Sequence, residues 1–163
     1  MADIRQGRWS AKIEGDFVVL LIGTKFPPLL HLIRTFLDVG GRRSMRHMLD
    51  YLVAHPEKGL LGYEIGFPAT VQYWRSFAHL DAFAKDRANP HLDVWRNYWR
   101  RVGKSGRTGI WHETYLVRAD EYETIYANMP PFGLGKAGEL RPVSGEGGAR
   151  HRIGVGINQG SAG

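Results

Sequence analysis

Apolar residues along the chain follow the spacing of strands and of helices in turn. Residues 16–26, DFVVLLIGTKF, are apolar at consecutive positions and rich in β-branched side chains, which predicts a strand covered on both faces. Residues 60–67 and 70–77 predict two more strands joined by a tight connection, an antiparallel hairpin. Residues 108–117 predict a fourth strand, and residues 122–127 predict a fifth.

The first helical region follows the first strand. Leu29, Leu32 and Phe36 begin an apolar pattern of helical spacing, which resumes over residues 45–53 after an interruption at the two glycines 40 and 41. We therefore expect two helical pieces with a break, or one kinked helix.

A second helical region follows the hairpin. Ser76 predicts the N-cap of a helix over residues 77–85, and Asn89 with Pro90 predicts the start of another over residues 91–102. Strand, helix, strand, strand, helix, strand is the split β-α-β order of ferredoxin-like folds. The sequence thus predicts an α+β fold in one domain over residues 1–130.

Composition limits what surrounds this domain. The chain has 163 residues, and residues 131–163 hold 10 of its 21 glycines and few large apolar groups, which predicts a largely irregular C-terminal tail. There is no cysteine, which excludes disulfides and thiolate ligands. The longest apolar run, residues 17–22, is far shorter than a membrane span, and the N-terminal segment does not have the pattern of a secretory signal. We expect a cytoplasmic protein with no membrane partner.

The net charge of +6 adds little to this picture. Basic residues cluster at 42–46 and again at 96–107, where Trp95, Tyr98 and Trp99 stand between them. Interleaved basic and aromatic residues also occur in nucleic-acid-binding surfaces. An amphipathic helix with a solvated basic face explains the pattern more simply, so we expect no nucleic-acid partner.

Ionisable groups in two of the strands are the strongest chemical signal. In GIWHETYLV, alternation places His112 on one face and Trp111, Glu113 and Tyr115 on the other. Buried sheets rarely contain such groups unless a ligand or an internal network satisfies them. His112 is the first candidate for a general base, although a hydrogen-bonded core histidine is the alternative.

The strand VQYWRSF adds Trp74 and Arg75, which also point to opposite faces. Arg75 and Glu113 fit a ligand site and, equally, an ion pair across a subunit interface. His31, in the first helix, is a second candidate histidine, and His91 fits a capping or exposed position in the first turn of a helix.

The sequence contains no motif for phosphate binding, for a metal site or for a serine nucleophile. The glycine pairs 133/135 and 154/156 lack the strand-turn-helix context of a phosphate loop, and no HExxH, EF-hand or Gly-x-Ser-x-Gly sequence occurs. His112 and Glu113 are adjacent, so they do not chelate one metal from one face. We expect no protein-bound metal site.

The segments GDFVVLLIG, VQYWRSFAHLDAFAKD, HLDVWRNYWRRVG, GIWHETYLV and YETIYANMPPFGLGKAG together resemble a family of small monooxygenases. The family is similar to the monooxygenase of the fungal fumagillin pathway and belongs to the dimeric α+β-barrel superfamily. The resemblance covers residues 7–138. It implies a homodimer in which two ferredoxin-like sheets close into one barrel, and a role in secondary metabolism. Superfamily relatives include cofactor-free antibiotic-biosynthesis monooxygenases and haem-bound aldoxime dehydratases, and they bind ligands between sheet and helices.

The resemblance extends to particular positions. The residues that match the family are His31, Trp74, Arg75, His91, Trp95, Trp111, His112 and Glu113. The segment after the first strand, GTKFPPLLHLIRTFLDVGGRRSM, departs from the family and changes the expected pocket.

Three hypotheses follow. The first is a cofactor-independent monooxygenase acting on a small aromatic or polyketide-like molecule. His112 would be its base, Arg75 or His31 would be anion donors, and the substrate would contact Trp74, Trp111, Glu113, Tyr115, His91 and Trp95. The second is a haem enzyme with His112 or His31 as axial ligand. The third is a non-enzymatic dimeric ligand-binding module.

Overall fold

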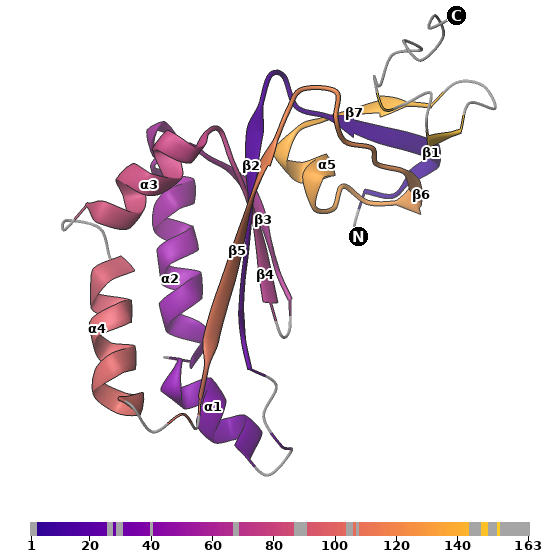
Figure 1. Cartoon of the computed structure of the whole chain (residues 1–163). Helices are drawn as coiled ribbons and strands as arrows, with labels where there is room; N and C mark the ends of the chain where they lie inside the picture. The colour runs from indigo at the N-terminus through magenta and orange to yellow at the C-terminus, as the bar shows by residue number, and fades with distance from the viewer. Residues whose placement is uncertain are drawn as a thin grey trace, which may run out of the picture.

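The computed structural model describes residues 3–25, 28, 31–39, 41–66, 69–86, 91–103, 106, 108–143, 148–149 and 153. It has two antiparallel sheets and five α-helices in these residues (Figure 1). The strands are β1 (Arg5–Lys12), β2 (Phe17–Thr24), β3 (Leu60–Ile65), β4 (Ala69–Trp74), β5 (Ile110–Val117), β6 (Tyr126–Met129) and β7 (Glu139–Pro142). The helices are α1 (Leu32–Asp38), α2 (Gly41–Ala54), α3 (Phe77–Lys85), α4 (His91–Val102) and α5 (Leu134–Ala137), with a 3-10 turn at Pro56–Lys58.

The larger sheet has the strand order β3-β4-β2-β5, with every neighbouring pair antiparallel. This is the ferredoxin-like order, so the predicted α+β fold is confirmed. The predicted break in the first helical region lies between α1 and α2. Ser76 caps α3 as predicted, because its Oγ accepts a hydrogen bond from the amide of His79 at 3.3 Å.

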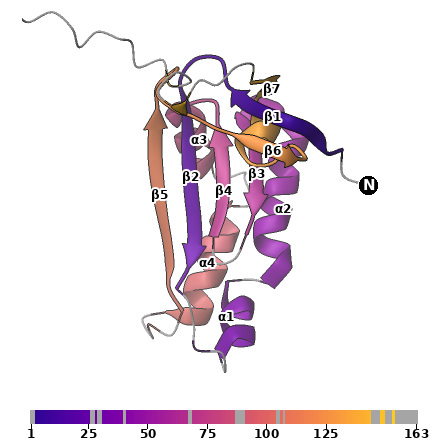
Figure 2. The ribbon, with the colours of Figure 1, turned by 90° about the vertical axis from the view of Figure 1, so that its right-hand side faces the viewer.

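Helices α2, α3 and α4 lie on one face of this sheet, and α1 lies below its lower end (Figures 1 and 2). The hydrophobic core on that face consists of Val18, Met48, Leu49, Leu52, Trp74 and Phe83. The apolar residues of α2 recur at helical spacing, so Met48, Leu49 and Leu52 share the face that packs against the sheet. α4 is amphipathic as predicted: Tyr98 and Val102 are buried, whereas Arg96 and Arg100 are exposed.

The smaller sheet, β6-β1-β7, lies with α5 against the opposite face of the larger sheet, near one end (Figure 1). Ala11, Ile13, Phe17 and Leu134 form its core. β1 and β7 were not predicted, and the predicted strand 122–127 overlaps β6, which belongs to this second sheet.

The start of the predicted irregular tail is ordered, because Leu134–Ala137 form α5 and Glu139–Pro142 form β7. The glycine at position 62 allows α5 to approach β3: a Cβ there would lie 2.9 Å from the Cβ of Ala137. From residue 144 onward, most of the tail lies outside the described residues.

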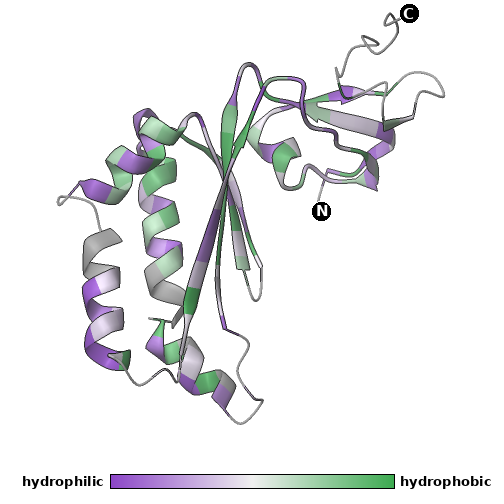
Figure 3. Cartoon of the chain, in the orientation of Figure 1, coloured by the Kyte–Doolittle hydropathy of each residue, from purple (hydrophilic) through white to green (hydrophobic). Residues whose placement is uncertain are grey.

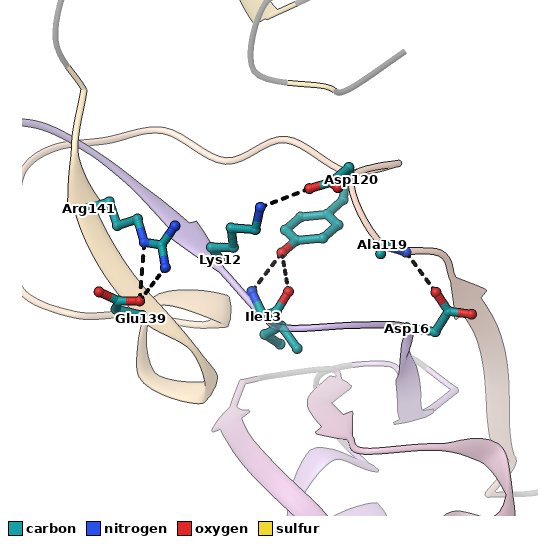
Figure 4. Close-up of polar contacts among 8 residues, drawn as sticks. Lys12, Ile13, Asp16, Ala119, Asp120, Glu139 and Arg141 are labelled. Carbon is teal, nitrogen blue, oxygen red and sulfur yellow. Dashed lines mark hydrogen bonds and ion pairs between the residues drawn. The ribbon is translucent and has the colours of Figure 1, made fainter. Parts of the chain in front are cut away.

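Polar contacts attach the smaller sheet to the larger one. The hydroxyl of Tyr122 accepts from the amide of Ile13 at 2.6 Å and lies 3.2 Å from its carbonyl oxygen, to which it donates. Asp16 accepts from the amide of Ala119 at 2.8 Å, and Lys12 pairs with Asp120 at 3.1 Å (Figure 4). These contacts fix the connection from β1 to β2 against the connection from β5 to β6.

No helix among the described residues has the length and apolar character needed to cross a membrane.

Candidate functional site

The register of the larger sheet separates its side chains into two rows per strand. The core residues Val18 and Trp74 define the face toward the helices. Val18 pairs with Leu116, Leu20 with Thr114 and Ile22 with His112, so these three β5 residues belong to the helix-facing row.

The helix-facing row of β5 is exposed although it points toward the helix layer. His112 and Thr114 are exposed, and Leu116 is 72% exposed. Helices lie behind the other three strands in Figure 2, but β5, at the edge of the sheet, has none directly behind most of its length. The described side chains therefore leave this row open to a ligand.

His112 is the ionisable group of this open row. No described residue hydrogen-bonds to its imidazole, whose two nitrogens thus remain available for a ligand or a proton. His112 lies beside Ile22. Figure 3 shows that β5 as a whole is hydrophilic along its middle, whereas its neighbours in the sheet are largely apolar. The role of general base stays a prediction for this residue.

Trp111, Glu113 and Tyr115 lie on the opposite face of the sheet, as the alternation predicted. All three are exposed, and the Tyr115 hydroxyl donates to Glu113 Oε2 at 2.6 Å. This hydrogen bond raises the pKa of the Tyr115 phenol above its ordinary value. These residues therefore do not share one side of the sheet with His112.

Trp74 and Arg75 also separate in space. Trp74 is fully buried in the helix-side core, 5.6 Å from the ring of Phe83 between centroids. Arg75 follows the end of β4 and is exposed. Among the described residues no ion pair joins Arg75 to Glu113 within the chain, and an ion pair between them across a subunit interface stays a prediction.

The distance between Arg75 and His112 follows from the register. Trp74 lies in the same cross-strand row as Leu116, which is four residues from His112 along β5. At about 3.4 Å per residue, the row that precedes Arg75 lies about 14 Å from the row of His112. Arg75 and His112 therefore lie in distant rows of the sheet.

The other predicted residues lie on the helices. His31 is the exposed N-cap residue of α1, and its side chain makes no capping hydrogen bond. The side chain of His91, in the first turn of α4, lies outside the described residues. Trp95 is half-buried, with its ring centroid 5.9 Å from that of Tyr98 and 6.5 Å from that of Trp99.

A buried polar network that the sequence did not single out holds α1, α4 and the start of β5 together. Thr108 Oγ1 donates to Asp38 Oδ2 at 2.8 Å, and the Tyr98 hydroxyl donates to the carbonyl of Thr108 at 2.9 Å. Arg101 Nε donates to the carbonyl of Asp38 at 3.0 Å. Burial, and then the charge of Asp38, raise the pKa of Tyr98. This network fixes the helix layer at the end of the sheet where His112 lies.

Gln72 is a second buried polar residue that the sequence did not single out. It lies on the helix-facing row of β4, between Thr70 and Trp74, and only 2% of it is exposed. The alternation in TVQYW places it on the same face as Trp74, but sequence alone does not distinguish a buried glutamine from an exposed one. Within the described residues, no group of three or more His, Asp or Glu side chains has the arrangement of a metal site.

Two aldoxime dehydratases of known structure have a similar fold. One, described as an aldoxime dehydratase, matches 82% of this chain and 41% of its own with a TM-score of 0.61 and 16% identity. Another, the enzyme OxdRE in complex with butyraldoxime, matches 77% of this chain and 38% of its own with a TM-score of 0.59 and 15% identity. At these identities the likeness concerns the fold, and it agrees with the α+β-barrel class.

The sequence defines the family more closely. The model of the monooxygenase af470-like family matches residues 17–134, so the chain belongs to this family. Monooxygenase af470 of Aspergillus fumigatus is 25% identical over 95% of this chain. The chain spans 62% of the length of that relative. The resemblance stated from the sequence is confirmed.

Proposed function

We propose that the chain is a cofactor-independent monooxygenase acting on a small aromatic or polyketide-like molecule bound along the helix-facing side of the sheet. The observation that carries the proposal is the exposed row of His112, Thr114 and Leu116, which presents an imidazole, a hydroxyl and an apolar group toward the helices. Membership of the monooxygenase af470-like family supports the reaction class.

Oxidation of an activated methylene group to a carbonyl suits such a site, because the substrate itself supplies the electrons. His112 removes a proton from the methylene carbon, the resulting carbanion reduces O2, and the protonated His112 returns its proton to the peroxide anion, which gives a hydroperoxide at that carbon. His112 then removes the second proton of this carbon, the O–O bond breaks, and the leaving hydroxide takes that proton and departs as water, which leaves the carbonyl. One oxygen atom enters the substrate and the other leaves as water, so the reaction balances without a cofactor.

The sheet geometry narrows the list of catalytic candidates. His112 is the base in this proposal. Arg75 receives no role, because it follows a row about 14 Å from that of His112 at strand spacing. His31 stays a candidate donor to the anion, because α1 follows the end of β2 that pairs with the start of β5. Trp111, Glu113 and Tyr115 are assigned to the opposite face.

Oxygen uptake with dithranol, an electron-rich anthrone, tests this function. We expect equal amounts of O2 consumed and anthraquinone formed, at a rate about a hundredfold lower in His112→Ala. His47→Ala is the matched control, because His47 is an exposed histidine on α2. Equal rates for the wild-type chain and His112→Ala, above the spontaneous oxidation of dithranol, would contradict the assignment of His112.

A haem-binding enzyme is the second candidate, favoured by the availability of the His112 imidazole. One histidine that makes no hydrogen bond to a described residue fits the donor set of a single axial ligand. Haem held there would supply an iron centre for oxygen or oxime chemistry. Titration with hemin separates the candidates: a saturable Soret band lost in His112→Ala or His31→Ala favours haem, and a featureless titration favours the cofactor-free enzyme.

We also propose that the chain forms a homodimer through the face of the sheet opposite the helices. The smaller sheet and α5 lie against this face near one end, and Trp111, Glu113 and Tyr115 remain exposed beyond them. A second copy seated there would cover these residues and place Glu113 opposite a basic residue such as Arg75 of the other chain. The likeness in fold to α+β barrels supports this arrangement.

A further inference from the structure

The amide of Gln72 is held in one orientation in the helix-side core. Its Oε1 accepts a hydrogen bond from Trp74 Nε1 at 3.1 Å, and both side chains are buried. An indole nitrogen is a donor only, so it selects the oxygen end of the amide. The nitrogen end of Gln72 therefore points away from Trp74, and a rotation of the amide would break this bond.

The amide nitrogen has a weak partner. Gln72 Nε2 lies 3.8 Å from the sulfur of Met45, at the beginning of α2. A thioether is a poor acceptor, whereas a buried N–H group has lost its hydrogen bonds to water and gains from a strong acceptor. Met45 is half-buried and has a flexible side chain, so it can move at small cost. An oxygen atom in place of the sulfur would satisfy the donor better.

Gln72 belongs to the same side of the sheet as His112. It pairs with Leu20, which pairs with Thr114 on its other side. His112 lies one row further along, beside Ile22. With strands about 4.8 Å apart and about 3.4 Å per residue along a strand, the Cα atoms of Gln72 and His112 are about 12 Å apart.

We propose that Gln72 is a substrate-binding residue whose Nε2–H donates to an oxygen of the ligand, which displaces the sulfur of Met45. Trp74 acts as a positioning residue because it orients the amide. The inference rests on the proposed function and deepens it. It defines the substrate as a fused-ring molecule with a carbonyl or phenolic oxygen at one end, bound by Gln72, and the reacting methylene near the other end, next to His112.

Two matched probes, 2-naphthol and naphthalene, test this hydrogen bond in the full chain. We expect the wild-type protein to bind 2-naphthol more tightly, and the ratio of the two dissociation constants reports the contribution of the hydroxyl. In Gln72→Met, which keeps the volume and a weak acceptor for Trp74, this ratio should fall about three- to tenfold. Binding of naphthalene should remain unchanged.

Three further variants sharpen the test. Gln72→Leu should repeat the result of Gln72→Met, and it serves if that variant fails to fold. Met45→Leu should raise the preference for 2-naphthol, because the sulfur no longer competes for the N–H group. Gln6→Met, the same substitution at an exposed position of β1, should leave the ratio unchanged.

The outcomes also separate this inference from the proposed function. A preference for 2-naphthol that is the same in the wild-type chain and both Gln72 variants overturns the role of Gln72. If dithranol oxidation still depends on His112 in that case, the proposed function stands. A wild-type chain that binds neither probe and does not oxidise dithranol overturns both. Equal loss of affinity for both probes would indicate a structural role for Gln72 and overturn the inference.

Discussion

His112 and Glu113 are neighbours in β5 but lie on opposite faces of the sheet, His112 beside Ile22 and Glu113 beside Leu21. One faces the helices, and the other faces the side where the smaller sheet is attached. Two adjacent residues therefore belong to two different surfaces, and substitutions at them have separable effects.

His112→Ala and Glu113→Lys test this separation. We expect His112→Ala to lower the rate of dithranol oxidation about a hundredfold and leave the sedimentation coefficient unchanged. Glu113→Lys reverses a charge in the proposed dimer interface, and like charges placed together there weaken association. Sedimentation velocity should then detect a shift toward monomer, with the 2-naphthol preference retained. The reverse pattern would mean that the two faces have been assigned the wrong roles.

Leu49 and Leu116 provide a matched pair of leucines on the helix side of the sheet. Leu49 is fully buried and Leu116 is 72% exposed. Leu49→Ala should lower the free energy of unfolding by about 2–5 kcal/mol, because it leaves a cavity in the core. Leu116→Ala should change stability by at most about 0.5 kcal/mol but weaken naphthalene binding, if that row contacts a ligand. Urea denaturation and ligand titration measure the two effects, and a large loss of stability at Leu116 would mean that the row is packed rather than open.

The hydroxyl of Tyr122 forms hydrogen bonds with both the backbone amide and the backbone carbonyl of Ile13. Tyr122→Phe removes both hydrogen bonds and should lower the free energy of unfolding by about 1–3 kcal/mol, since the half-buried backbone groups lose their partner. Tyr115→Phe is the control, because its hydroxyl is exposed on the sheet and bonds only to Glu113 among the described residues. Equal stability of the two variants in urea would show that the contact with Ile13 contributes nothing measurable.

Alkaline pH should destabilise the fold. Burial is the main cause that raises the pKa values of Tyr73, Tyr98 and Tyr126 above the ordinary value of 10.0. The folded chain then holds these protons at pH values where the unfolded chain has lost them. The stabilisation is fully present below pH 10 and is lost as the pH rises through the folded-state pKa values.

Thermal unfolding at pH 8 to 11, with tyrosinate absorbance recorded in parallel, measures this dependence. The unfolding temperature should fall above pH 10, and the fall should be shallower in the double variant Tyr73→Phe, Tyr126→Phe. Both substitutions also remove hydroxyl contacts, so the slope with pH is the relevant quantity rather than the stability at one pH. An identical slope in the variant and the wild-type chain would contradict the argument.

The local pattern of the sequence predicted the central sheet but not the smaller one. Strands β2 to β5 have β-branched or aromatic residues at strand spacing, and their order follows from the split β-α-β arrangement. β1, RQGRWSAK, is charged and contains a glycine, so its strand structure depends on partners far along the chain. The backbone amide of Gly7 in β1 donates a hydrogen bond to the side chain of Asn128, 121 residues away. No local pattern carries that information.

Only those features of the site that depend on a single strand could be predicted from the sequence. Alternation separated His112 from Trp111 and Glu113 correctly, since it is a property of one strand. Which face the helices cover, and that they leave β5 open, depends on packing between distant segments. The burial of Trp74 and Gln72, and the network around Asp38, belong to that second kind of information.

The position of β1 has a consequence for the order of events during synthesis. β1 is made early, but its two neighbours, β6 and β7, come from Tyr126–Met129 and Glu139–Pro142. Ribosomes add about 5–20 residues per second, so β1 remains unpaired for several seconds while β2 to β5 emerge and assemble. The larger sheet, β2 to β5, can therefore form first. It lies in the sequence between β1 and the two strands β6 and β7, so the smaller sheet forms last. In a chain stalled before residue 126, the backbone hydrogen-bonding groups of β1 would have no strand to pair with. Formation of the smaller sheet would then be the last step of folding.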